Sequence, residues 1–123
     1  MSNNFLRTLY LDPELHSNIK IQLIKDKIEK KDKIYNSITE LVLNTWETFL
    51  QSNMNIKGYR IVKGKVLKTT DMDKTTVSFP TELNNLVKKY LSRFDNKEAK
   101  LEDKSFSLIT NELLQRIYLD QEI

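Results

Sequence analysis

Hydrogen-bonding side chains alternate with apolar ones in two short stretches of the chain, residues 5–12 (FLRTLYLD) and 74–80 (KTTVSFP). Side chains of a β-strand point alternately to its two faces, so every second residue of each stretch would share one face. The residues on the more polar of these faces are Leu6, Thr8, Tyr10, Lys74, Thr76 and Ser78. Hydroxyl and ammonium groups in such rows can donate hydrogen bonds to the polar edges of a ligand. This is binding chemistry, and it needs no nucleophile or metal.

The positive charge of the chain is concentrated in its middle. Residues 51–74 carry six Lys and Arg against two Asp, whereas residues 1–50 and 75–123 have net charges of 0 and −1. A local cluster of cations can bind a polyanion even when the whole chain is nearly neutral. The cations between the two halves are Lys57, Arg60, Lys63, Lys65 and Lys68. This segment is interpreted either as a hairpin or extended arm that binds a polyanion, or as a tether whose lysines face water.

Several functional classes find no support in the composition. There is no Cys, the single histidine is His16, and the only glycines are Gly58 and Gly64, so the chain lacks thiolate chemistry and a phosphate-binding glycine loop. We therefore expect no enzymatic activity, no cofactor and no metal site. The chain also lacks a signal peptide and a run of about 20 apolar residues. We expect a cytoplasmic protein with no membrane partner.

The two halves of the chain repeat the same apolar pattern at an offset of 68 residues. The offset aligns Leu9 with Val77, Leu11 with Phe79, Leu15 with Leu83, Ile19 with Val87, Leu41 with Ile109, and Trp46 with Leu114. A match that continues without a gap through a strand, a proline and two helices indicates duplication. The sequence thus predicts unit 1 at residues 1–50, a basic linker at 51–73 and unit 2 at 74–123, with one shared core.

Each unit begins with a strand that stops at a proline, followed by two helices. Pro13 and Pro80 suit the first turn of a helix, and Asp12 is a candidate N-cap. The apolar spacing predicts a core-facing stripe on each first helix. The stripe residues are Leu15, Ile19, Leu23 and Ile28 in unit 1, and Leu83, Leu86, Val87, Tyr90, Leu91 and Phe94 in unit 2. Ser37 and Ser105 are expected to open the second helices as N-caps.

One strand and two helices cannot close a core alone, because a single strand has no partner for its backbone groups. Antiparallel pairing of the two strands would solve this by forming a two-stranded ribbon over four helices. Its inner face would consist of Leu9, Leu11, Val77 and Phe79. The final helices would pack through Trp46, Phe49, Leu114 and Ile117. The predicted fold is therefore mostly α.

The stretches TVSFPTELNNLVKKYL (76–91) and SITELVLNTWETFL (37–50) resemble the strand, proline and helices of ribbon-helix-helix DNA-binding proteins of the Arc, MetJ and CopG type. The resemblance implies a tandem form, an intramolecular pseudo-dimer with both units on one chain. It also implies binding of double-stranded DNA, with the ribbon reading base edges in the major groove. One chain would then read two unlike half-sites.

The resemblance assigns base reading to Leu6, Thr8, Tyr10, Lys74, Thr76 and Ser78. It assigns phosphate contacts to the helix starts at Ser37, Ile38, Thr39, Ser105, Phe106 and Ser107, to Arg7, and to the linker arm with Lys57, Arg60, Lys63, Lys65 and Lys68. Arg7 falls on the inward side of its strand. Either it bends out to DNA at the strand edge, or unit 1 contributes mainly thymine-methyl and phosphate contacts.

The resemblance favours a sequence-specific transcriptional repressor on the nucleoid. A plasmid or conjugation accessory protein is the alternative within DNA binding, and an antitoxin-like or protein-binding adaptor is the alternative outside it. The pseudo-dimer is expected to act as a monomer, with a homodimer or higher assembly on DNA as a further alternative.

Overall fold

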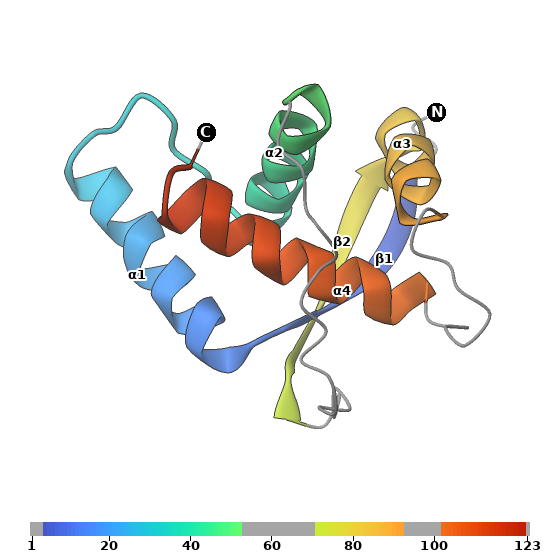
Figure 1. The fold of residues 1–123 in the computed structure, drawn as a ribbon. Helices are drawn as coiled ribbons and strands as arrows, with labels where there is room; N and C mark the ends of the chain where they lie inside the picture. The colour runs from blue at the N-terminus through green and yellow to red at the C-terminus, as the bar shows by residue number, and fades with distance from the viewer. Residues whose placement is uncertain (1–3, 53–70, 93–101, 123) are drawn as a thin grey trace.

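The computed structural model describes residues 4–52, 71–92 and 102–122 (Figure 1). The elements in chain order are β1 (Asn4–Leu11), α1 (Pro13–Ile28), α2 (Ile38–Gln51), β2 (Asp73–Pro80), α3 (Thr81–Leu91), α4 (Glu102–Leu113) and the π-helical segment η3 (Leu114–Leu119), which continues α4. The described part is mostly helical with one two-stranded sheet, as the sequence predicts.

The two strands pair antiparallel, and their register places Thr8 opposite Thr76. Leu9, Leu11, Val77 and Phe79 are fully buried, so the predicted inner face of the ribbon is confirmed. Helices α2, α3 and α4 supply the main helical contacts of this ribbon, and α4 crosses the ribbon in Figure 1. The first helix, α1, packs instead against η3 at the side of the molecule.

The helix starts follow the local sequence signals. Asp12 caps α1 by accepting a hydrogen bond from the backbone N–H of Leu15 at 3.0 Å, and Pro13 occupies the first helical position. Ser37 caps α2 in the same way, with its hydroxyl accepting from the N–H of Glu40 at 3.2 Å. The predicted N-caps at Asp12 and Ser37 are confirmed.

The end of α1 is a left-handed turn without glycine. Lys30 has φ 52°, the N–H of Lys31 donates to the carbonyl of Asp26 at 3.1 Å, and the N–H of Lys30 donates to Lys27 at 3.3 Å. These two bonds form the pattern of a Schellman motif, in which glycine is the preferred left-handed residue. Hydrogen bonding of the last carbonyls thus ends the helix although the sequence offers no glycine or proline there.

Helices α2 and α4 meet at the centre of the core. Trp46 is fully buried, its ring is parallel to that of Phe106 with centroids 6.1 Å apart, and its indole N–H donates to the hydroxyl of Thr110 at 3.0 Å. Phe49 and Leu114 are also buried, while Ile117 is half-buried against the core. The prediction that these residues belong to the core is confirmed.

Three details of the predicted helices are wrong. Helix α4 begins at Glu102, so Ser105 lies inside it and is not its N-cap. Ile28 and Leu86, which were predicted for core-facing stripes, are exposed. Ile28 lies on the side of α1 opposite the buried Leu15 and Ile19. Leu86 lies at the edge of its stripe, next to the buried Val87, and turns toward solvent. The prediction for Phe94 lies outside the described residues.

Positions related by the 68-residue offset have similar burial. Leu15 and Leu83 are both buried, as are Leu41 and Ile109. The further buried pairs are Leu9 with Val77, Leu11 with Phe79, Ile19 with Val87, and Trp46 with Leu114. Among the described residues, no helix is long and apolar enough to span a membrane.

Candidate nucleic-acid interface

The outer face of the ribbon brings together all six residues predicted to read bases. The register pairs Leu6 with Ser78, Thr8 with Thr76, and Tyr10 with Lys74, and directly paired residues of an antiparallel sheet share a face. The six residues Leu6, Thr8, Tyr10, Lys74, Thr76 and Ser78 are called the outer ribbon face below. The side chain of Leu6 is 73% exposed, and Lys74 and Thr76 are also exposed. The grouping is confirmed, whereas base reading stays a prediction.

Helix α4 holds the backbone of β1 behind this face. The Ser107 hydroxyl accepts from the N–H of Tyr10 at 3.0 Å, and the Asn111 amide donates to the carbonyl of Tyr10 at 2.8 Å. The Asn111 oxygen also accepts from the N–H of Asp12 at 2.9 Å. These bonds occupy backbone groups at the strand edge and thereby fix the position of Tyr10. Asn111 was not predicted to contact the ribbon. The signal in the sequence is that it lies four residues after Ser107, and therefore on the same side of α4.

Arg7 points to the helices and away from the outer ribbon face. Its Nε donates to Oδ1 of Asn84 at 2.6 Å, and its guanidinium carbon lies 5.1 Å from the centroid of the Phe106 ring. A guanidinium over an aromatic ring gains a cation–π attraction. Arg7 therefore links β1 to α3 and α4 in this arrangement. A phosphate contact from Arg7 stays a prediction.

The start of α2 retains the geometry expected of an anion site. Ser37 is the N-cap and Ile38 the first helical residue, so the N–H groups of Ile38 and Thr39 lie at the positive end of the helix dipole. The Glu40 carboxylate accepts from the N–H of Asn36 at 2.9 Å and places a negative charge at the same end. Phosphate contact here stays a prediction, and the Glu40 charge would weaken it.

The corresponding prediction for unit 2 does not have this geometry. Ser105, Phe106 and Ser107 follow the first three residues of α4, so their N–H groups lie within the helix and not at its open start. Phe106 and Ser107 are also buried. The geometric reason for expecting phosphate contacts from these three residues is therefore absent. The predicted linker contacts of Lys57, Arg60, Lys63, Lys65 and Lys68 lie outside the described residues.

Two polar contacts beside the ribbon were not predicted from the sequence. His16 on α1 lies 2.8 Å from the carboxylate of Asp73 at the start of β2. Asn84, which binds Arg7, is a buried polar residue on α3. A lone histidine or asparagine on a helix gives no local signal for partners that lie 57 or 77 residues away.

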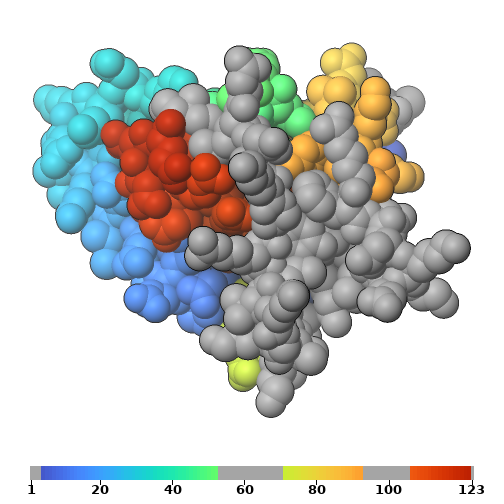
Figure 2. Space-filling model, in the orientation of Figure 1, coloured from blue at the N-terminus to red at the C-terminus, as the bar shows by residue number. Residues whose placement is uncertain are grey.

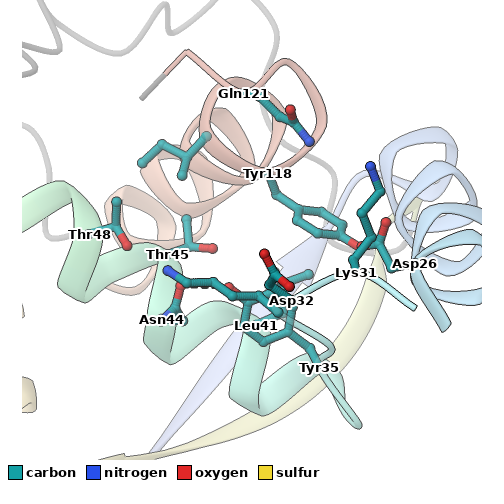
Figure 3. Close-up of a pocket in the computed structure, with 12 residues that line it drawn as sticks. Asp26, Lys31, Asp32, Tyr35, Leu41, Asn44, Thr45, Thr48, Tyr118 and Gln121 are labelled. Atoms are coloured by element: carbon teal, nitrogen blue, oxygen red, sulfur yellow. Dashed lines mark hydrogen bonds between the residues drawn. The ribbon is translucent and has the colours of Figure 1, made fainter. Parts of the chain in front are cut away.

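A separate cavity of about 380 Å³ lies between the end of α1, the segment that leads into α2, α2 itself and η3 (Figure 3). Beside it, the buried carboxylate of Asp26 accepts from Tyr118 and Gln22, each at 2.8 Å. Burial raises the pKa of Tyr118, and its hydrogen bond to Asp26 raises this pKa further. The Tyr118 hydroxyl therefore remains a neutral donor that ties η3 to α1.

Comparison with models of protein families, with curated proteins and with solved structures finds no match to this chain. In the described part of the chain, no three His, Asp or Glu side chains gather in a way that could hold a metal ion. The function is therefore inferred from the outer ribbon face.

Proposed function

We propose that this chain is a sequence-specific double-stranded DNA-binding protein that reads the major groove with the outer ribbon face. The observation that carries the proposal is the antiparallel register, which gathers Lys74 and the hydroxyls of Thr8, Thr76, Tyr10 and Ser78 on the face away from the core. A two-stranded ribbon fits into the major groove, where hydroxyl and ammonium groups reach base edges. Regulation of transcription, as a repressor in the cytoplasm, is the role that the ribbon-helix-helix resemblance favours.

The strand register also supports the proposal that the chain is a tandem ribbon-helix-helix pseudo-dimer. Thr8 and Thr76 are paired across the ribbon, and they are also the residues that the 68-residue sequence offset makes equivalent. In a two-fold arrangement of two related units, the central pair of the ribbon must consist of equivalent residues. An approximate two-fold axis would therefore pass between Thr8 and Thr76. The strand register and the sequence repeat are independent observations, and both make these two residues equivalent.

The two halves of the proposed reading face differ in chemistry. Unit 1 contributes Leu6 and Tyr10, whereas the positions related to them in unit 2 hold Lys74 and Ser78. Leu6 can contact a thymine methyl group, while Lys74 can donate to guanine O6 and N7. A single molecule would thus read an asymmetric DNA site, and a palindrome would require a second molecule.

The experiment is selection of bound sequences from a random pool of duplex DNA, with light scattering on the complex to count its chains. We expect a short asymmetric motif bound by one chain. We also expect affinity to fall with salt, with a slope of about −0.9 for each phosphate neutralised. Failure to enrich any sequence, with weak binding that is equal for all duplexes, would contradict the proposal.

A further inference from the structure

Helix α1 has apolar residues on two opposite sides. Leu15 and Ile19 are buried against the core, whereas Ile21, Ile24 and Ile28 are 52%, 59% and 75% exposed. With 3.6 residues per turn, these three isoleucines lie on the side of the helix opposite Leu15 and Ile19. They are called the isoleucine seam below. Helix α1 borders the molecule in Figures 1 and 2, with one side turned away from the other described elements.

Unit 2 has no such seam. The 68-residue offset relates Ile21, Ile24 and Ile28 to Lys89, Ser92 and Asn96, which are all polar. Of these three, Lys89 lies on α3, which ends at Leu91, and it is exposed. Helix α3 thus packs against the core with a lysine at the position equivalent to Ile21. The isoleucine seam requires a different physical reason, because exposing three isoleucines in succession gains nothing for an isolated chain.

The spacing of the seam is that of a helix–helix contact. Ile21, Ile24 and Ile28 fall at positions a, d and a of a heptad, which form the narrow apolar line of a coiled coil. The flanking g and e positions hold Lys20, Lys25 and Lys27, which are all exposed. Within the described part of the chain, none of these lysines forms an ion pair.

We propose that the isoleucine seam is a docking surface for a helix of a partner protein with apolar a and d positions and Asp or Glu at its e and g positions. Charges at e and g select the partner of a coiled coil, and lysine on both flanks would repel a second α1. The seam is also narrower than the broad apolar face of a helix that lies on a membrane. This surface is separate from the outer ribbon face, so the two proposals can fail independently.

The probe is a labelled peptide of three heptads with Ile at a, Leu at d and Glu at e and g, titrated with the full chain by fluorescence anisotropy. The main variant is Ile21→Lys, Ile24→Ser and Ile28→Asn, which gives α1 the residues of unit 2. We expect this variant to lose affinity for the peptide by about tenfold or more, equivalent to about 1.4 kcal/mol. Its circular dichroism and DNA affinity should stay unchanged, because the replaced side chains are exposed on α1.

Two further variants test whether the isoleucine seam selects a helix with acidic e and g positions. The variant Lys20→Glu, Lys25→Glu and Lys27→Glu should lose the acidic peptide and bind a matched peptide with Lys at e and g. Leu86→Ser, at an isolated exposed leucine on α3, is the control and should bind the acidic peptide like the unchanged chain. Equal peptide binding by the unchanged chain and the isoleucine variant, or no peptide binding at all, would overturn the proposal.

Seam-dependent dimerisation of the chain in sedimentation would also overturn it and would indicate a second copy. Seam-dependent binding to phosphatidylglycerol vesicles, without peptide binding, would overturn it in favour of a lipid surface.

Discussion

Among single residues, Lys74 provides the only cation of the outer ribbon face, whose other members carry four hydroxyl groups and one apolar side chain. Hydrogen bonds to bases carry sequence information, whereas a cation near the phosphates contributes affinity that salt weakens. The position of Lys74 opposite Tyr10 places its ammonium group at one end of the paired strands. The contribution of this residue can therefore be separated from that of the hydroxyls by its salt dependence or by its base preference.

Lys74→Ala should weaken binding of the selected duplex. If the ammonium group contacts a phosphate, the slope of log affinity against log salt should become shallower by about 0.9. If it contacts a base, discrimination at one position should fall by about 1–3 kcal/mol. The measurement is fluorescence anisotropy at several salt concentrations. Lys88→Ala is the matched control, since Lys88 is exposed on α3 and the same charge is lost. Equal effects of the two substitutions would contradict a specific role for Lys74.

Tyr118→Phe should lower the free energy of unfolding by about 1–3 kcal/mol at neutral pH, because the buried Asp26 carboxylate loses one of its donors. The pKa of Tyr118 is raised in the fold above its ordinary value of 10.0. Its stabilising contribution is thus complete below pH 10 and is lost as the pH rises toward the raised value. Urea unfolding from pH 7 to 11 should therefore show a stability difference between the two proteins that shrinks above pH 10. A constant difference would contradict this account.

At the scale of elements, the starts of α1 and α2 were predictable, whereas the start of α4 was not. Asp12 and Ser37 cap helices through contacts with residues three positions later, which the local sequence encodes. Helix α4 instead begins at Glu102, inside a charged stretch that contains neither glycine nor proline. An acidic residue is also favourable in the first turn of a helix. The serine at position 105 was therefore not the only residue at which α4 could begin.

Lys30→Gly should stabilise the fold by about 0.5–1 kcal/mol, because Lys30 has a left-handed backbone in the turn that ends α1. The same substitution at Lys25, an exposed position inside α1, should destabilise the fold by about 1 kcal/mol. Urea unfolding of the two variants provides the comparison. Destabilisation by both substitutions would show that residue 30 does not need the left-handed conformation.

Trp46→Ala should lower the free energy of unfolding by about 3–5 kcal/mol, since the side chain is fully buried between α2 and α4. Thr110→Val should lower the free energy of unfolding by less, about 1–3 kcal/mol. It leaves the Trp46 indole N–H without its acceptor but keeps the side-chain volume at position 110. Chemical denaturation measures both. A cost below about 1 kcal/mol for Trp46→Ala would contradict a shared core of this kind.

At the scale of the whole molecule, alternation in residues 74–80 and the repeated apolar pattern were sufficient to predict the ribbon and its buried face. These features are local or periodic, and burial of Leu9 and Val77 follows from them. The contact of Arg7 with Asn84 and Phe106 could not be predicted, because it depends on how α3 and α4 cross the ribbon. Sequence periodicity identifies the face of an element, whereas tertiary packing decides which of its polar groups remain available.

The central claim is that DNA contacts the outer ribbon face, and site-directed crosslinking tests it most directly. The chain has no cysteine, so Thr76→Cys and Ser17→Cys each provide one attachment point for a photocrosslinker. Thr76 lies on the outer ribbon face, while Ser17 is an exposed residue of α1. With duplex DNA at about the physiological ionic strength of 0.15 M, we predict crosslinks from position 76 and few or none from position 17. Equal crosslinking from both positions, or crosslinking from position 17 alone, would contradict the account.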